Sequence, residues 1–304
     1  MRTPHPWIEP LPEGEGIFLR MTDRILLVGA TGFLGSAVAA RLAQRQPIAL
    51  IRSSSDRSVL PEGMEVRCGD LGADLPLDGI SSLVYCASMG LGHIPGVVQQ
   101  LEERGVKRAV FISTTAIFTT LPSTSRTVRL EAESVVQGSS LDWTILRPTM
   151  IYGTARDRNV SRLLRFFRRC PVFPLCGNGL WQPIYVEDLA DGVVAALDSP
   201  RAAKRVYNLA GARPLLFADL LRVAGRAVGR HVTLVRVPLE AAVVAAKVTR
   251  IVSAEQIRRL AEDRAFSYAD AARDFGFAPR TFEQGVTREA ESLGLSPASR
   301  LLTK

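Results

Sequence analysis

A glycine-rich turn near the start of the chain constrains the fold most. Residues 28–35 read VGATGFLG and stand between the apolar run RILLVG (24–29) and FLGSAVAARLAQR (33–45), whose apolar residues recur at helical spacing. Gly29 permits a tight turn, Gly32 lets the backbone approach a pyrophosphate, and Gly35 lets the helix pack closely on the strand. Between a strand and a helix, this pattern predicts a dinucleotide-binding turn. The residues expected to contact the cofactor here are Gly29, Thr31, Gly32, Phe33, Leu34 and Gly35.

Short apolar runs alternate with helical segments from residue 24 to about residue 150. After the first run, the strand candidates are PIALIR (47–52), MEVRC (64–68), SLVYCAS (82–88), RAVFIST (108–114) and DWTILRP (142–148). A helix is expected over PGVVQQLEERG (95–105) and another after Thr127. Such alternation predicts an α/β fold with a doubly wound parallel sheet covered on both faces, the Rossmann arrangement.

The pattern changes after Pro148. An arginine-rich helix is expected over 158–169, then a loop (170–183), a strand PIYV, a helix over 188–197, a strand RVYNLA (205–210) and mostly helix from about 214. We therefore predict a flexible N-terminal extension (1–22) and a Rossmann domain (23–155) to which 184–210 returns. Residues 156–183 and 211–304 would form a smaller, mostly helical substrate-binding lobe.

Composition excludes several classes of protein. With 47% hydrophobic and 22% charged residues among 304, the chain reads as a globular protein, and no apolar window is long enough to span a bilayer. The first twenty residues carry three glutamates and no apolar core, unlike a secretory signal, so we expect a cytoplasmic protein. Its four cysteines lack metal-ligand spacing and are expected to be reduced, buried thiols, with no metal site.

The net charge of +8 indicates an anionic ligand or surface. No nucleic-acid-binding motif is present and only 7% of residues are aromatic, so a nucleic-acid partner is not expected.

The second strand ends in ALIRSSS (49–55), where an NAD binder carries an acid that holds the ribose hydroxyl. Here Arg52 takes that place and the first acid is Asp56. Because a guanidinium pairs with a 2′-phosphate, we predict NADP(H) in preference to NAD(H); the other reading is a solvated surface arginine.

Further motifs follow in a fixed order over roughly residues 23–290. They are CGDL (68–71), YCAS (85–88), VKRAVFIST (106–114), TILRPTMIYG (144–153) and GNGLWQPIYVEDLADGVVAAL (177–197). Together with the G-x-x-G-x-x-G spacing, they resemble the NAD-dependent epimerase/dehydratase family of extended and atypical short-chain dehydrogenase/reductases. The resemblance implies Asp70 and Leu71 near the adenine, and Ala87, Ser88 and Pro148 along the cofactor. It also implies Ser113 and Thr114 in the active site, with Thr115 and Tyr152 toward the substrate.

One stretch departs from that family. Members carry a tyrosine and a lysine four residues apart, but aligning RLEAE within LPSTSRTVRLEAES (121–134) puts Ser125 at the tyrosine and Arg129 at the lysine. The tyrosine is the family's general acid/base, and a serine hydroxyl is too weak an acid to replace it unaided. Arg129 can anchor the cofactor ribose or a phosphate. His93, after the fourth strand, is the best remaining proton donor; its other reading is a helix-capping or loop-packing residue.

The segment ARDRNVSRLLRFFRRC (155–170) holds six arginines and one acid. Arg158, Arg162, Arg165 and Arg169 fall on one helical face. That face is expected to bind a substrate diphosphate, chiefly through Arg158 and Arg162, or to lie against anionic lipid, or to be solvated.

Two functional hypotheses result. The first is an NADP(H)-using epimerase, dehydratase or reductase that acts on a small-molecule substrate, a nucleotide-activated sugar or a related carbonyl compound. The second is a non-catalytic NADP(H)-binding regulator or assembly protein, because the proton-transfer pair is missing. By family resemblance, a homodimer is also expected.

Overall fold

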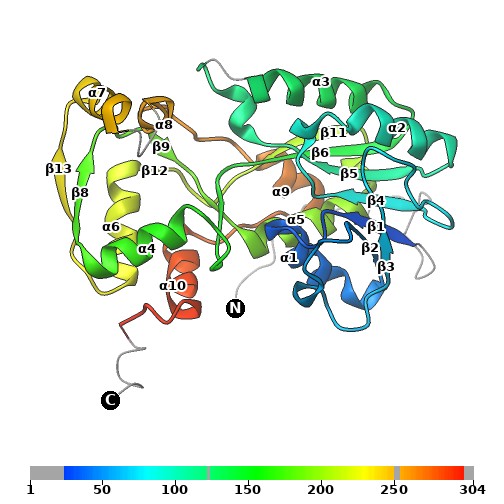
Figure 1. Ribbon diagram of the computed structural model, residues 1–304, viewed down its shortest axis with the longest axis horizontal. Helices are drawn as coiled ribbons and strands as arrows, with labels where there is room; N and C mark the ends of the chain where they lie inside the picture. Colours follow the sequence, from blue (N-terminus) through cyan, green and yellow to red (C-terminus); the bar gives the residue numbers. More distant parts are fainter. Residues whose placement is uncertain (1–23, 122–123, 250–253, 298–304) are drawn as a thin grey trace, which may run out of the picture.

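A seven-stranded parallel sheet forms the centre of the protein in the computed structural model, which describes residues 24–121, 124–249 and 254–297 (Figure 1). The strand order is β11-β6-β5-β4-β1-β2-β3, and every neighbouring pair is parallel. The strands are β1 (Ile25–Val28), β2 (Ile48–Ile51), β3 (Val66–Cys68), β4 (Ser82–Tyr85), β5 (Arg108–Ile112), β6 (Asp142–Pro148) and β11 (Arg205–Leu209). The predicted doubly wound fold is confirmed, with the order reversing between β1 and β4, where such sheets bind ligands.

Helices cover both faces of this sheet, and a separate apolar cluster lies on each side. One cluster joins α1 (Phe33–Leu42), α5 (Val186–Asp198) and α9 (Ala269–Phe275) to one face. The other joins α2 (Ile94–Glu103) and α3 (Thr124–Gly138) to the opposite face. Along β1, Ile25 and Leu27 belong to the first cluster while Leu26 and Val28 belong to the second. Because successive side chains alternate between two buried faces, the strand reads as a continuous apolar run.

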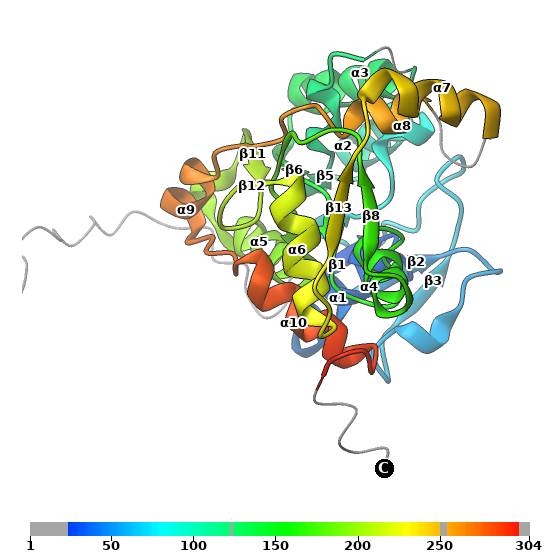
Figure 2. The same cartoon turned by 90° about the vertical axis from the view of Figure 1, so that its left-hand side faces the viewer.

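A third apolar cluster forms the core of a second lobe, seen face-on in Figure 2. It packs α4 (Val160–Arg169), α6 (Phe217–Ala227) and α10 (Phe282–Ser292) against one another. Beside them, α7 (Leu239–Thr249) contacts α8 (Ala254–Arg259). The lobe also holds three two-stranded pairs: β7 (Ile151–Tyr152) with β10 (Ile184–Tyr185), β8 (Val172–Leu175) with β13 (Thr233–Arg236), and β9 (Leu180–Trp181) with β12 (Leu215–Leu216).

The start of α4 differs from the prediction. The helix begins at Val160, and Asp157 accepts hydrogen bonds from the backbone amides of Asn159, Val160 and Ser161. A carboxylate at this place satisfies amides that have no partner inside the helix, so the helix starts after it. Arg158 therefore precedes the helix that it was predicted to begin.

The predicted domain boundaries stay a prediction, and the expected extension (1–22) lies outside the described residues. In the structure, β11 pairs with β6 and α5 packs against α1, so this part of the chain lies with the sheet. None of the helices in the described ranges has the length and apolarity that crossing a bilayer requires.

Candidate functional site

The glycine turn between β1 and α1 has the geometry that its sequence predicts. Gly29 has φ +76°, and a Cβ there would come within 2.8 Å of the amide nitrogen of Ala87. A Cβ on Gly35 would overlap the carbonyl oxygen of Gly29. The amide of Gly32 donates to that same oxygen at 2.9 Å, and the first turn of α1 carries no acid. The bare backbone and the helix N-terminus together fit the pyrophosphate of a dinucleotide.

The loop after β2 begins with an exposed arginine. The side chain of Arg52 is exposed and its amide donates to Ser55 Oγ at 3.2 Å. Asp56, the first acid, accepts from the amide and hydroxyl of Ser58, and these bonds lower the pKa of Asp56. The Asp56 carboxylate is thus engaged with its own turn, while the Arg52 side chain at the start of the loop is exposed. The preference for NADP(H) stays a prediction.

The predicted adenine-side residues lie on the turn after β3. Asp70 Oδ1 accepts from the amide of Gly72 at 2.9 Å, and Leu71 packs against the α2–α3 cluster. His93, just before α2, lies beside the same turn: its Cε1 is 3.8 Å from where a Cβ of Gly72 would be. His93 does not line the pocket that contains Ser113. This placement gives no support to His93 as the proton donor.

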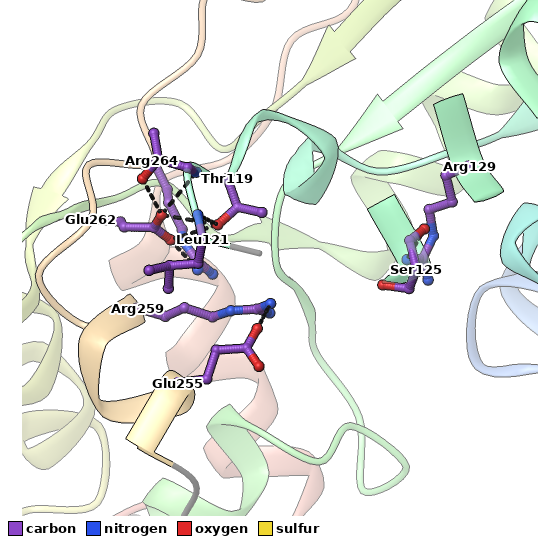
Figure 3. A network of polar contacts seen from close by, with 9 residues as sticks. Thr119, Leu121, Ser125, Arg129, Glu255, Arg259, Glu262 and Arg264 are labelled. Carbon is purple, nitrogen blue, oxygen red and sulfur yellow. Dashed lines mark hydrogen bonds and ion pairs between the residues drawn. The ribbon is translucent and has the colours of Figure 1, made fainter. Parts of the chain in front are cut away.

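A pocket of about 290 Å³ lies at the carboxyl ends of β4 and β5. Arg129 lies over Gly90, with its Cζ 3.4 Å from where a Cβ would be, and its Nη1 donates to the Ser125 carbonyl at 3.2 Å. Arg259 enters from α8, in the other lobe, where it is paired with Glu255 (Figure 3). No acid lines this pocket in the part of the chain that the structure describes. The lining residues are Ser88, Met89, Ile112, Ser113, Thr114, Ala116, Ser125, Arg129 and Arg259.

Ser113 belongs to a buried polar network that the sequence reasoning missed. Its hydroxyl donates to Glu133 Oε1 at 2.5 Å, and Arg147 forms an ion pair with the same carboxylate. The Glu133 side chain is only 2% exposed and that of Arg147 is 18% exposed. The available signal was a glutamate on the inner, apolar side of α3, next to the buried Ala132. Because the Ser113 proton is committed to Glu133, the Ser113 oxygen offers an acceptor to the pocket.

A larger pocket of about 740 Å³ lies between the loop after β5 and the second lobe. It shares Thr114, Ala116 and Arg259 with the smaller pocket, so the two adjoin. Trp181 and Gln182 line it from the second lobe. Its volume falls within the usual range for small-molecule sites.

Glu262 connects the two sides of this larger pocket through hydrogen bonds (Figure 3). It accepts from the Thr119 hydroxyl at 2.9 Å, from the Thr120 amide at 3.2 Å and from Arg264 at 3.1 Å. Burial works to raise the pKa of Glu262, but these hydrogen bonds outweigh it and lower the pKa. The Arg264 guanidinium also lies 4.9 Å from the centre of the Trp181 ring. Sequence reasoning named none of these residues.

Several predicted substrate residues lie elsewhere. Tyr152 is 1% exposed, its hydroxyl points at the Phe282 carbonyl at 3.5 Å, and burial raises its pKa. It is a core residue of the second lobe and lines neither pocket, so its placement gives no support to a role in substrate binding. Arg158 and Arg162 are exposed and line neither pocket, so they give no support to a diphosphate site there. Contact of this basic face with lipid stays a prediction, as does a homodimer.

Three further expectations concern Thr115, the cysteines and metal binding. Thr115 is buried, and its hydroxyl donates to the carbonyl of Pro148 at 3.2 Å. Cys68 and Cys170 are exposed, which corrects the expectation that the thiols are buried; burial does raise the pKa of Cys86 to about 12. Within the described ranges, no three His, Cys, Asp or Glu side chains gather as a metal site would need.

Comparison with known proteins adds independent findings. Residues 29–200 match the model of a protein family described as NAD(P)H-binding. UDP-glucose 4-epimerase of Vibrio cholerae is 24% identical over 266 residues, covering 72% of this chain and 80% of that protein. Subunit 9 of the NADH dehydrogenase 1 alpha subcomplex of Arabidopsis thaliana is 28% identical over 215 residues, and this chain spans about half (52%) of its length. The structure of UDP-glucose 4-epimerase from Thermotoga maritima with UDP-glucose superposes with a TM-score of 0.71 at 15% identity, covering 89% of this chain and 98% of that one, which shows a shared fold.

Proposed function

This chain belongs to the NAD(P)H-binding family, and from that premise we propose that it is an NADP(H)-dependent oxidoreductase of the epimerase/dehydratase type. Its substrate would be a nucleotide-activated sugar or a related carbonyl compound. The observation that carries the proposal is the pair of adjoining pockets at the carboxyl ends of β4 and β5. The smaller holds two arginines and several hydroxyls, and the larger has room for a substrate.

We propose the same cofactor-binding residues that the family resemblance implies. The backbone of the Gly29–Gly35 turn would hold the pyrophosphate, Arg52 the 2′-phosphate, and Asp70 with Leu71 the adenine side. Ala87, Ser88, Arg129 and Pro148 would line the other end of the cofactor. The cofactor, when bound, supplies or accepts the hydride.

Charge stabilisation replaces proton donation in this proposal. Reducing a carbonyl places negative charge on its oxygen, and fixed cations beside that oxygen lower the barrier. Arg129 and Arg259 both line the smaller pocket and can do so. Thr114 Oγ1 accepts from the amide of Ala116, which leaves its proton available to a ligand. Ser113, held by Glu133, offers an acceptor that can orient a substrate hydroxyl.

Among the reactions of this class, reduction fits these residues best. Epimerisation through a ketone, or dehydration, requires a base that removes a proton from the substrate. Neither Arg129 nor Arg259 can act as that base, because a guanidinium remains protonated. A hydride transfer whose product oxyanion takes its proton from water needs only the stabilising charges.

The test is NADPH oxidation, followed by its absorbance, with a panel of keto-sugar nucleotides and simple ketones and aldehydes. We expect turnover with at least one class of carbonyl compound. Arg129→Gln should lower kcat about 100-fold, the usual effect of removing one oxyanion-stabilising group. Glu131→Gln, an exposed change on the same helix, serves as the control. NADPH that binds but is never oxidised would refute the enzyme proposal.

A second candidate is a non-catalytic NADP(H)-binding regulator or assembly protein. The observation in its favour is that Ser125 and Arg129, which the sequence aligns with the proton-transfer pair, line the smaller pocket, while the Ser113 hydroxyl donates to Glu133. The similarity to a subunit of NADH dehydrogenase agrees with it. Tight binding of NADPH without turnover, together with co-purification of a protein complex, would favour this candidate.

A further inference from the structure

Arg156, which follows β7, reaches back to the glycine turn. Its Nη2 donates to the carbonyl oxygen of Thr31 at 2.5 Å, and its Nη1 donates to Ser36 Oγ at 3.2 Å. Thr31 lies within the turn and Ser36 lies in the first turns of α1. Arg156 is itself exposed. The Arg156 guanidinium, from the segment that leads into the second lobe, therefore contacts the glycine turn that is expected to hold the cofactor.

The charge of Arg156 also acts on the loop after β2. The pKa of Asp56 is lowered first by its hydrogen bonds from Ser58 and, in smaller part, by the positive charge of Arg156. That loop begins with Arg52. β1 and β2 are paired neighbours, so the glycine turn that follows β1 and the loop that follows β2 leave the same edge of the sheet side by side. Arg156 contacts the first of these, and the second reads the ribose 2′ position in this fold.

We infer that Arg156 and Arg52 together form a two-guanidinium site for the 2′-phosphate of NADP(H). This inference rests on the proposed NADP(H) preference. Both present partners of Arg156 are neutral oxygen atoms, a carbonyl and a hydroxyl. A phosphate would bring a full negative charge and could accept two parallel hydrogen bonds from one guanidinium, which neither neutral partner offers, so the 2′-phosphate would compete well for Arg156.

The site would connect cofactor choice to the substrate pocket. Next to Arg156, Asp157 holds the amides that begin α4. Asn159, in the same short segment, lines the larger pocket. A phosphate that engages Arg156 would fix this segment, whereas NAD(H) would leave it without that contact.

The experiment measures the Kd of NADPH and of NADH by fluorescence titration for wild type, Arg156→Gln, Arg52→Gln and Arg158→Gln. We expect Arg156→Gln to weaken NADPH binding about 10- to 100-fold, the range for a hydrogen bond to a charged group, and NADH binding less than about threefold. Arg158→Gln removes an exposed arginine two residues away and should change neither. Arg156→Lys, which keeps the charge, should retain a preference for NADPH and covers the case in which the glutamine variant does not fold.

Each other outcome overturns the inference. If Arg156→Gln raised the Kd of NADPH and of NADH equally, Arg156 would contact the pyrophosphate instead. If neither Kd changed, Arg156 would only connect its segment to the glycine turn. A wild type that prefers NADH would overturn the cofactor preference of the proposed function along with this inference. A wild type that prefers NADPH, with Arg156→Gln unchanged, overturns this inference alone.

Discussion

Replacing Glu289 with glutamine is expected to flatten the dependence of stability on pH and to stabilise the protein above pH 7. Glu289 is fully buried on α10, and Asp157, 5% exposed, faces it from the start of α4. Burial first, and then the neighbouring Asp157 carboxyl group, raise the pKa of Glu289 to about 9, while Arg165 acts in the opposite direction. The Asp157 oxygens accept hydrogen bonds from three backbone amides at the start of α4, whereas neither carboxylate oxygen of Glu289 has a hydrogen-bond partner among the described residues.

The sign and size follow from proton linkage. An unfolded glutamate releases its proton near its ordinary pKa of 4.5, whereas the folded one holds it up to about 9. Stability from this group is therefore fully present below pH 4.5 and is lost as pH rises toward 9. Within that window the loss is about 1.4 kcal/mol per pH unit, so from pH 5.5 to 8 it amounts to roughly 3 kcal/mol.

The assay is urea unfolding at pH 5.5 and pH 8, followed by circular dichroism. The wild type should lose roughly 3 kcal/mol more than Glu289→Gln between the two pH values. Glu291→Gln removes an exposed carboxylate from the same helix and should keep the wild-type dependence. If Glu289→Gln shows the same decline as the wild type, Glu289 is not protonated in the folded protein and the reasoning is wrong.

Three further outcomes can be measured. Gly35→Ala should raise the Kd of NADPH more than about tenfold in a fluorescence titration, because the new Cβ would overlap the Gly29 carbonyl and force the turn apart; an unchanged Kd would contradict that close packing. Glu133→Ala should lower the free energy of unfolding by about 3–5 kcal/mol in urea, because Arg147 would lose its buried partner; a loss under about 1 kcal/mol would contradict a buried ion pair. The single-turnover rate of NADPH oxidation should be flat from about pH 6 to 9, since the proposed reaction uses guanidinium groups and no acid that titrates in that range; a slope would implicate a titrating acid.

The central sheet could be predicted from the sequence because each of its strands is a local signal. Buried parallel strands are short apolar runs. Amphipathic helices follow β1, β4 and β5, which makes the alternation visible in the sequence. In the second lobe, β10 falls within the predicted strand PIYV, whereas the other paired strands gave no such signal. β9 and β12 have two residues each, too few to show alternation, and their pairing depends on packing around Trp181 and Phe217.

The candidate site shows the same contrast between local sequence signals and contacts that depend on the fold. The glycine turn and Arg52 lie in continuous sequence motifs. The backbone geometry of such a motif is determined by its own residues. The contacts between Glu262 and Thr119 join residues 143 positions apart, and those between Arg156 and Thr31 join residues 125 apart. Only the fold brings such pairs together. Tyr152 shows the converse: its motif is local, but packing against Phe282 and Gly285 determines which way the ring points.

The stretch that breaks the family pattern gains a physical meaning from the structure. At the end of α3 nearest the pocket, Ser125 and Arg129 provide polarity and charge without a titrating group. One turn further on, Glu133 accepts a hydrogen bond from the Ser113 hydroxyl and is ion-paired with Arg147. The α3 residues that line the pocket are therefore a serine, whose hydroxyl is too weak an acid to act unaided, and an arginine, whose guanidinium does not donate a proton near neutral pH. Such a lining can hold an anion and stabilise negative charge, but it lacks the tyrosine-type proton donor. That asymmetry is why reduction, or cofactor binding alone, fits this chain better than a reaction that must remove a proton from its substrate.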